Sequence, residues 1–535
     1  MTALKMVDLP MFGRPTMPQA TLMGRGGVEL GGQERKRGGH STAGRPQAIQ
    51  SQGSAGFRPR CAVGCGARLA SSDSRPGSQA PHGTQRRQSS EASAVKTAIL
   101  GAGISGLALA RFMLEGGHPA SGVHLFEAAP VAGGLCRSKT VEGFTYDISG
   151  GHILFSKDAK AQAWMKQNAG GDKAFVERKR QTKIRFEDRW VHYPFENGLG
   201  DLPQEANFDC LKGYIEAWHG RQEKDSQAPR EFGAWVRWRF GEGIARHFMD
   251  PYNEKVWKRD LARLSSDWVA GRVPDAPLED VLKAALGLRS EGYTHQSVFH
   301  YPRQGGFQAI TDGLAAQLGQ SVRYGTPVTA LQRVGHNWKV NGEAFDCVVS
   351  TLPLTSLPNI VEDLPADVAV AMGGLEFNSV LCFLLALNRP KHPDLSWIYL
   401  PHASQGPANR VTYMSNYAEN NAPEGQTSFL CEVTFDGAGP PLDASCESEV
   451  IDGLVHAGVL KREEILFSDH SISRHAYVVF DHDYHARREL ALGWLDANGI
   501  CALGRFGRFE YDNSDMCVIK SRELAAKLLD RAAQG

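Results

Sequence analysis

The feature that most constrains this chain is a glycine-rich turn between an apolar segment and an amphipathic one. Residues 95–100 are predicted to form a short strand, the motif G-x-G-x-x-G (Gly101, Gly103, Gly106) follows at once, and residues 107–117 are predicted to be helical. The first glycine permits a tight turn, the second lets the backbone approach a pyrophosphate, and the third lets the helix pack on the strand. Because the free N–H groups of a helix N-terminus stabilise anions, this unit predicts a dinucleotide site.

A carboxylate and a second pair of glycines extend this predicted site. Glu127 ends the next predicted strand, 26 positions after Gly101, where its carboxylate can accept hydrogen bonds from the ribose hydroxyls of adenosine. Gly133 and Gly134 offer the backbone a second close approach, and Arg137 places a cation near the phosphates. NAD and FAD share the glycine fingerprint, so the motif by itself leaves the choice between them open.

The order of a glutamate, a glycine pair and a serine (Glu127, Gly133, Gly134, Ser138) resembles the FAD-containing amine-oxidase-like superfamily. The resemblance implies FAD as the cofactor and a glycine-containing strand that returns beside the flavin near the end of the chain. It also implies backbone contacts at the adenine end and a glycine loop against the flavin. The further cofactor-binding residues implied in this way are Gly150, Gly151, Val328, Gly504, Arg505 and Asn513.

Hydrophobic periodicity divides the rest of the chain. Residues 205–290 place apolar side chains three or four positions apart, as helices do, whereas 180–200 and 375–480 alternate as strands do. We therefore expect an α/β fold, with a discontinuous FAD-binding Rossmann-type domain, a helical insertion and an antiparallel β-sheet insertion. The predicted parts are a disordered basic extension (1–94), the FAD-binding domain (95–179, 300–360 and 495–535), the helical domain (205–299) and an antiparallel-sheet substrate domain (180–204 and 361–494).

The first 94 residues differ in composition from the rest. They carry 13 basic and 5 acidic side chains, a net charge of +8, in a chain whose 59 basic and 59 acidic side chains balance overall. They are rich in Gly, Ser, Gln, Pro and Arg and lack periodicity, so we expect them to be disordered. An organelle presequence, a weak nucleic-acid-binding arm and translated upstream sequence stay open as interpretations. Deletion of this segment is expected to leave stability and activity intact.

Composition argues against several classes of protein. No apolar run approaches the roughly 18 residues of a membrane helix, so no membrane partner is expected, and the longest run, Val380 to Leu387, is predicted to be a buried strand. The ten scattered cysteines favour reduced thiols and a cytoplasmic location. Cys61 and Cys65 have no second Cys/His pair at zinc-site spacing, so no metal site is expected. The basic residues are dispersed, and no specific nucleic-acid partner is expected either.

Five segments resemble, in matching order, the UDP-galactopyranose mutase family. The resemblance implies interconversion of UDP-galactopyranose and UDP-galactofuranose at a reduced flavin, through an adduct of flavin N5 with the sugar and without net redox change. A reduced nicotinamide, NADPH or NADH, is compatible with the role of reductant. The segments are 149–158, 190–203, 248–257, 396–401 and 504–511.

Two arginines match the family's diphosphate-binding positions. Arg272 follows Trp257 by 15 residues, and Arg410 follows Trp397 by 13. Their planar guanidinium groups suit phosphate oxygens, and a surface salt bridge is the alternative for each. Three tyrosines fall at positions similar to those that donate hydroxyls to the same diphosphate, with core packing as the alternative: Tyr399, Tyr484 and Tyr511.

Other site residues follow from the uridine-binding and glycine-loop segments. An aromatic face can stack on uracil, although single aromatics are more often part of a core. Glu196 stands where some relatives have glutamine, and a carboxylate there would repel a diphosphate. His152 is implied to lie against the flavin, as a functional side chain or as a structural histidine. The substrate-binding residues implied are Tyr193, Phe195, Tyr252, Asn253, Trp257 and Trp397.

The sequence leaves two other functions open. An amine-oxidase-like FAD-dependent oxidoreductase would explain the cofactor unit equally well. It would not explain the arginines and tyrosines, because a pocket for a neutral or cationic substrate is usually apolar. A flavin-bound scaffold that uses the basic extension is the third class. The exact UDP-sugar, the physiological reductant and association of the chain into a homo-oligomer are left open.

Overall fold

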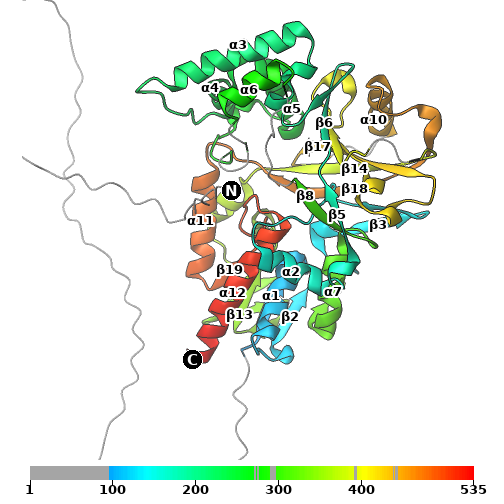
Figure 1. Ribbon diagram of the computed structural model, residues 1–535. Helices are drawn as coiled ribbons and strands as arrows, with labels where there is room; N and C mark the ends of the chain where they lie inside the picture. The colour runs from blue at the N-terminus through cyan, green and yellow to red at the C-terminus, as the bar shows by residue number, and fades with distance from the viewer. Residues whose placement is uncertain are drawn as a thin grey trace, which may run out of the picture. The chain divides into compact units, whose positions relative to one another are not determined.

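The structure, a computed structural model, describes residues 95–269, 273, 276–288, 297–390, 394–437, 439 and 444–534 (Figure 1). The expected disorder of residues 1–94 therefore lies outside the described residues, as do Cys61, Cys65 and the predicted diphosphate ligand Arg272.

A five-stranded parallel sheet forms the lower part of the molecule in Figure 1. Its strands, in spatial order, are β19 (Ile500–Ala502), β13 (Cys347–Ser350), β1 (Thr97–Leu100), β2 (Val123–Phe126) and β9 (Val322–Arg323). Every pair in it is parallel. Such a sheet requires cover on both faces, and its strands are accordingly rich in apolar residues.

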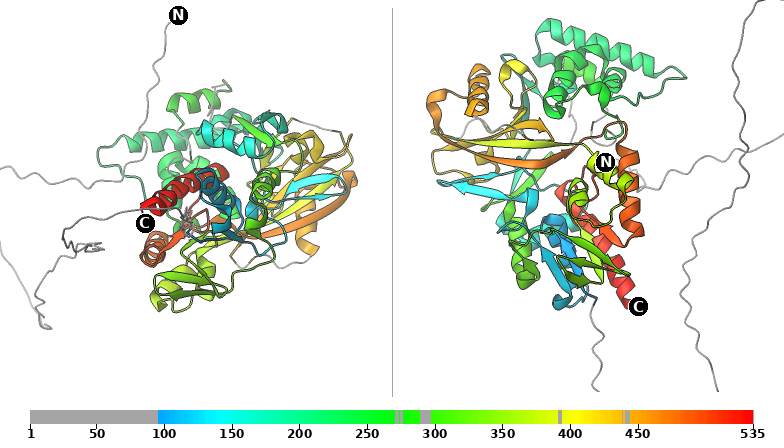
Figure 2. Two further views of the ribbon diagram at one scale, coloured as in Figure 1. Left: turned by 90° about the horizontal axis from the view of Figure 1, so that it is seen from below. Right: turned by 180° about the vertical axis from the view of Figure 1, so that it is seen from behind.

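Alternate residues of these strands enter two separate cores. Ile99, Leu125 and Val349 pack on one face with helices α1 (Ile104–Glu115) and α7 (Gln308–Leu318). Leu100, Phe126 and Val348 pack on the other face with α8 (Ala366–Gly373) and α11 (Tyr484–Ala497). The C-terminal helix α12 (Ser514–Gln534) packs against α1, and the two lie side by side in the view from below (Figure 2). The last helix of the chain thus covers the first β-α-β unit.

A second, seven-stranded sheet lies above the first in Figure 1. Its order is β18 (Ile465–Val478), β14 (Phe377–Leu387), β17 (Thr427–Asp436), β16 (Arg410–Thr412), β15 (Trp397–Tyr399), β6 (Thr182–Phe186) and β7 (Arg189–His192). All neighbours are antiparallel except β15 and β6. The predicted buried strand 380–387 lies within β14, and all of its residues are buried.

Helices between β7 and β8 cover the end of this sheet that holds β6 and β7. They are α3 (Gln204–Arg221), α4 (Phe232–Ile244), α5 (Asp250–Trp257) and α6 (Leu278–Ala285). Their apolar side chains share one core with Ile184, Phe186 and Val191 of β6 and β7. The remaining elements of more than two residues outside the short 3-10 turns are β3 (Ser138–Val141), β4 (Phe144–Asp147), α2 (Ala159–Asn168), β5 (Phe175–Lys179), the π-turn Ala245–Met249, β8 (Val298–Pro302), β10 (Leu331–Val334), β11 (Asn337–Val340), β12 (Glu343–Phe345), α9 (Met414–Tyr417) and α10 (Ala444–His456).

The predicted fold class is confirmed: a parallel α/β sheet is combined with a helical insertion and a largely antiparallel sheet. Within the described ranges, no helix is both long enough and apolar enough to span a lipid bilayer.

Candidate functional site

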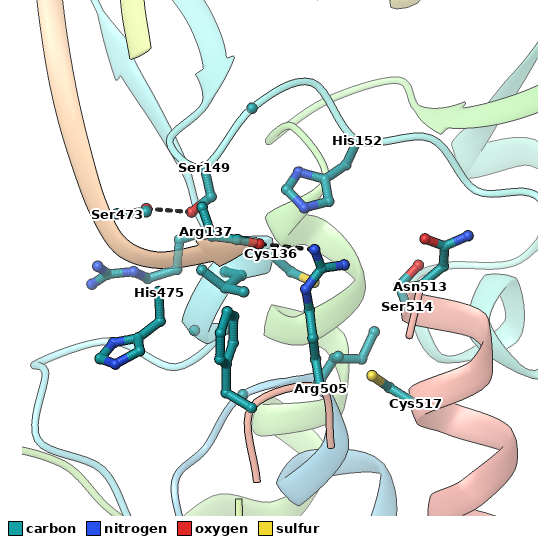
Figure 3. Close-up of a pocket in the computed structure, with 18 of the residues that line it drawn as sticks. Cys136, Arg137, Ser149, His152, Ser473, His475, Arg505, Asn513, Ser514 and Cys517 are labelled. Atoms are coloured by element: carbon teal, nitrogen blue, oxygen red, sulfur yellow. Dashed lines mark hydrogen bonds between the residues drawn. The ribbon is translucent and has the colours of Figure 1, made fainter. Parts of the chain in front are cut away.

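A cavity of about 660 Å³ opens where the parallel sheet meets the larger sheet (Figure 3). Residues just beyond the carboxyl ends of four parallel strands line it: Gly101 after β1, Glu127 after β2, Thr351 after β13 and Gly504 after β19. In open α/β sheets, ligands bind at this end of the strands. The large sheet supplies the opposite wall.

The glycine turn has the geometry that its motif predicts. Gly101 has a φ of +100°, and its N–H donates to the Phe126 carbonyl at 2.8 Å. A Cβ on Gly106 would lie 2.1 Å from the Gly101 carbonyl oxygen, so only glycine allows the helix to start this close to the strand. No side chain caps α1, and its first residues line the cavity, as do Asn513 and Ser514 at the start of α12. The N-terminus of α1 thus presents N–H groups to a phosphate-bearing ligand.

Glu127 is held by two backbone donors. Its Oε2 accepts from the Ala102 N–H and its Oε1 from the Ala129 N–H, both at 2.9 Å. Because each carboxylate oxygen has a second lone pair, Glu127 can still accept from ribose hydroxyls. Gly133 and Gly134 have φ values of +118° and +55°, and a Cβ on Gly134 would lie 3.2 Å from the Gly103 Cα. The two glycine turns therefore approach each other at backbone distance.

The cavity wall contains buried polar atoms that make no hydrogen bond within the described chain. They are Arg137 Nε, His152 Nδ1 and Arg505 Nε. Buried polar groups are normally paired, so unpaired ones around one cavity indicate a polar ligand. Together with Glu127 and the glycine turns, they fit a dinucleotide whose other end is a planar heterocycle.

Arg505 follows β19 and lies at one end of this cavity, where backbone carbonyls hold its guanidinium. It donates to the Asp512 carbonyl at 3.1 Å and to the Ala476 carbonyl at 2.8 Å. Its guanidinium carbon lies 4.2 Å from the centroid of the Tyr511 ring. The neighbouring Gly504 has a φ of +85°, and a Cβ there would lie 2.7 Å from Ser105 Oγ. This strand end can therefore approach a bound heterocycle.

The loop Gly150–His152 forms the next part of the wall. The backbone N–H of His152 donates to Oδ2 of the fully buried Asp147 at 3.0 Å. The His152 ring stacks on the Phe307 ring, with centroids 5.1 Å apart. Burial lowers the pKa of His152, although Asp147 opposes this effect. His152 is therefore a neutral imidazole near pH 7 and has no charge to offer a phosphate.

A cluster of one arginine and four tyrosines forms another part of the wall, and three of its members, Arg410, Tyr399 and Tyr477, stand on strands of the large sheet. Arg410 lies near Tyr399, Tyr417 and Tyr477, and Tyr511, which follows β19, stacks on Tyr477. Burial raises the pKa of Tyr399, Tyr417 and Tyr477, so their hydroxyls stay protonated and can donate. Burial disfavours the charge on Arg410, but Glu432 together with Tyr477, Tyr399 and Tyr417 outweighs this effect and raises the pKa of Arg410, which keeps its charge.

The uridine-site residues expected from the sequence lie behind this wall. Tyr193 and Tyr252 contact Tyr399 with ring centroids 5.3 and 5.2 Å away. Phe195 is only 1% exposed and stacks on Phe248, which stacks in turn on Tyr252. These residues, with Asn253 and Trp257, are not among those that line the cavity.

Asn253 and Trp257 support Tyr252 from within α5. Trp257 Nε1 donates to Asn253 Oδ1 at 3.1 Å, and Asn253 Nδ2 donates to the Met249 carbonyl at 2.7 Å. Both side chains are buried. Because these polar atoms bond within the same helical stretch, they fix α5 and thereby the position of Tyr252.

One sequence expectation needs correction. Tyr484 was expected at the diphosphate, but it begins α11, is buried in the core, and donates to the Phe509 carbonyl at 2.5 Å. Tyr477, at the end of β18, lines the cavity instead. The side chain of Val328 packs against the core beside β10–β12 and is not among those that line the cavity, so its expected backbone contact at the adenine end stays a prediction.

The error over the tyrosines came from the match of sequence positions to the family. Asn378 of β14 pairs with Tyr477, and Val380 pairs with Ser473, so a step of two residues along β14 corresponds to a step of four along β18. Because both steps are even, Ser473 and Tyr477 face the same side of the sheet, and both line the cavity. Tyr484 lies beyond this strand, at the start of α11.

Glu196 is buried, and this burial raises its pKa to about 7, with Arg239 partly opposing the effect. It does not line the cavity. The repulsion expected from the sequence between Glu196 and a diphosphate is therefore weakened, because burial favours the neutral form of the carboxyl.

Comparisons with known proteins agree with this geometry. The family model described as "Flavin containing amine oxidoreductase" matches residues 104–457, about two thirds of the chain. The chain belongs to this flavin-containing amine oxidoreductase family. Family membership supports FAD as the cofactor, and the glycine turns, Glu127, Arg137 and Arg505 are the residues that would hold it.

Solved structures resemble the chain to different degrees. The structure of a reduced UDP-galactopyranose mutase has a TM-score of 0.75 and 26% identity, and the match covers 82% of this chain and 96% of that one. A putative protoporphyrinogen oxidase from Exiguobacterium sp. 255-15 has a TM-score of 0.62 and 16% identity, with 82% and 99% covered. A fatty acid isomerase from P. acnes has a TM-score of 0.54 and 14% identity, with 81% and 98% covered. The latter two show the fold alone.

Proposed function

We propose that this protein is a flavin-dependent mutase that interconverts UDP-galactopyranose and UDP-galactofuranose. The observation that carries the proposal is the wall of the cavity built from Arg410 and the hydroxyl-bearing rings of Tyr399, Tyr417, Tyr477 and Tyr511. A guanidinium and several fixed hydroxyl donors suit a diphosphate, which is rich in acceptors. The similarity to the reduced mutase structure supports the same interpretation.

In this proposal, each group of the chain has a separate task. Bound reduced FAD would supply a covalent, non-redox route for opening and closing the sugar ring. Arg410 and the tyrosines would bind the diphosphate and stabilise the charge that develops on it as the sugar is released. Tyr193 and Tyr252, behind Tyr399, would set the position of the nucleoside.

A second candidate, an amine-oxidase-like oxidoreductase, is favoured by one observation. Glu432 occupies one side of the Arg410 guanidinium, so the net charge of this wall is lower than an isolated arginine would give. The aromatic rings of Trp397, Tyr399 and Tyr417 would also suit a neutral or cationic substrate.

A spectral titration of the oxidised holoenzyme without oxygen separates the two candidates. The mutase proposal predicts that UDP and UDP-galactose perturb the flavin absorbance saturably and that putrescine and benzylamine leave the flavin oxidised. Reduction of the flavin by an amine, without a response to UDP, would contradict the proposal and favour the oxidoreductase.

A further inference from the structure

Two cysteines lie together at the edge of the parallel sheet, away from the cavity. Cys347 is on β13 and Cys501 is on the edge strand β19, where it pairs with Val349 of β13 (Figure 1). Because Cys347 and Val349 are two positions apart on one strand, both cysteines face the same side of the sheet. Both are reduced and half-buried, and neither lines the cavity.

The two thiols contact each other. The Cys347 thiol donates a hydrogen bond to the sulfur of Cys501, and Thr97, the register partner of Cys347 on β1, hydrogen-bonds to Cys347 from the other side. The hydrogen bond from Cys347 lowers the pKa of Cys501 to about 7, against the effect of burial, and Arg531 of α12 acts in the same direction. The same bond raises the pKa of Cys347. The pair therefore yields one thiolate, the form that binds soft ions, near neutral pH.

The strand geometry separates the two backbones too far for an unstrained disulfide. Cys347 and Cys501 are diagonal neighbours on adjacent strands, which places their Cα atoms about 7–8 Å apart. A disulfide usually requires less than about 7 Å unless the backbone moves. The backbone of Cys347 is held between β1 and β19 by the parallel ladder. An atom inserted between the two sulfurs therefore suits this pair better than a direct S–S bond.

The surroundings of the pair restrict the kind of atom that it can bind. In the described part of the chain, no cluster of three or more His, Cys, Asp and Glu side chains could hold a metal ion. A zinc ion, which takes four ligands, would therefore lack donors here. Thiolates select soft centres such as Cu(I). Leu524 and Leu528 of α12 pack on the same core as the two cysteines, so this side of the site is apolar.

We propose that Cys347 and Cys501 form a dithiol site for a soft, thiophilic centre that takes two sulfur ligands, such as Cu(I) or a trivalent arsenical with one organic group. With an arsenical R–As=O, two S–H bonds and the As=O bond are replaced by two As–S bonds and the two O–H bonds of a released water. Arsenic stays trivalent, so no oxidant or reductant is needed. With Cu(I), two Cu–S bonds form and both thiol protons pass to solvent. The site is independent of the proposed function.

The test titrates the FAD-loaded full chain with phenylarsine oxide, in a parent protein whose Cys61 and Cys65 are replaced by serine. We expect one equivalent to bind and FAD content to stay unchanged, because the pair lies away from the cavity. Cys347→Ser and Cys501→Ser should each weaken binding by about a hundredfold or more, since the second As–S bond forms within one molecule. Cys446→Ser, which changes another half-buried cysteine, on α10, is the control and should bind as the parent does.

Peptide mapping tests the same assignment without either serine variant, should one of them fail to fold. The arsenical should protect Cys347 and Cys501, and no other pair of cysteines, from iodoacetamide. Titration with Cu(I) under nitrogen, against a competing chelator, then distinguishes the occupants: binding at the same cysteines adds the metal, and its absence restricts the site to arsenicals.

Three results would overturn the proposal. They are an unchanged affinity for phenylarsine oxide in both Cys347→Ser and Cys501→Ser, protection of other cysteines in their place, and a Cys347–Cys501 disulfide that forms with hydroxyethyl disulfide while no arsenical adduct forms. The last result would identify a disulfide pair. None of these results bears on UDP binding or on mutase activity, so the two proposals can fail separately.

Discussion

Tyr399 and Arg410 are register partners in the antiparallel pair β15–β16. Directly paired residues project from the same face of a sheet, so this short pair brings a phenol and a guanidinium to one wall of the cavity. The two positions are eleven residues apart in sequence, and the strand pairing alone makes them neighbours. Arg410 next pairs with Glu432 on β17, which fixes its orientation.

Arg410→Lys should weaken UDP binding by about tenfold to a hundredfold, because loss of a charge-assisted, two-point contact costs about 1.5–3 kcal/mol. The lysine keeps a charge opposite Glu432, so FAD content should stay as in the wild type. UDP titration and the ratio of flavin to protein absorbance measure the two effects. Arg389→Lys, away from the cavity, is the control, and equal UDP affinity in all three proteins would refute the role of Arg410.

Tyr477→Phe should weaken UDP binding, whereas Tyr484→Phe should lower stability. Removal of the Tyr477 hydroxyl should weaken UDP binding by about threefold to tenfold, since a neutral hydrogen bond contributes about 0.5–1.5 kcal/mol. Removal of the Tyr484 hydroxyl takes a hydrogen bond from the buried Phe509 carbonyl and should lower the free energy of unfolding by about 1–3 kcal/mol, with UDP affinity unchanged. A loss of UDP affinity in Tyr484→Phe alone would place Tyr484, and not Tyr477, at the nucleotide.

Glu127→Gln should lower FAD affinity by about tenfold. The amide nitrogen must face either the Ala102 or the Ala129 N–H, so one backbone donor loses its acceptor and the carboxylate no longer sits at the ribose. Fluorescence titration of the apoprotein with FAD measures the change. If FAD binds the variant as tightly as the wild type, Glu127 does not contact the cofactor.

Gly106→Ala should abolish FAD binding or folding, because its Cβ would lie 2.1 Å from the Gly101 carbonyl oxygen. A Cβ on Gly220, in α3, would meet no atom within 4 Å, so Gly220→Ala should fold, bind FAD and gain up to about 1 kcal/mol of stability. FAD content and thermal melting compare the two. A Gly106→Ala protein with normal FAD content would show that the turn tolerates a methyl group.

Glu196 should make stability fall as pH rises. Its folded-state pKa of about 7 lies above the usual value near 4.3, so the folded protein holds this proton more strongly than the unfolded chain. The contribution is fully present below about pH 4 and is lost as the pH rises to about 7, by about 3.7 kcal/mol at most. The free energy of unfolding of Glu196→Gln, minus that of the wild type, should therefore be larger at pH 8 than at pH 5. Urea unfolding at both pH values measures this, and a difference independent of pH would contradict it.

The sequence allowed the cofactor unit to be predicted well, because Gly101, Gly106 and Glu127 act through local geometry that a short motif records. Glu432 was missed, although its signal is present: a lone glutamate within the apolar strand β17 needs a partner once it is buried. That the partner is Arg410 depends on the pairing of β16 with β17, which no local pattern reveals. The exchange of Tyr484 for Tyr477 has another origin: the resemblance matched positions in sequence, whereas the end of β18, and not the start of α11, supplies the tyrosine that lines the cavity.

The most direct test of the mutase proposal is a conversion assay. Full-length holoenzyme is reduced with dithionite without oxygen and incubated with UDP-galactofuranose, and the nucleotide sugars are separated by chromatography. We predict the appearance of UDP-galactopyranose with the reduced enzyme and none with the oxidised enzyme. Equal conversion by both forms, or none by the reduced, FAD-loaded enzyme, would contradict the proposal.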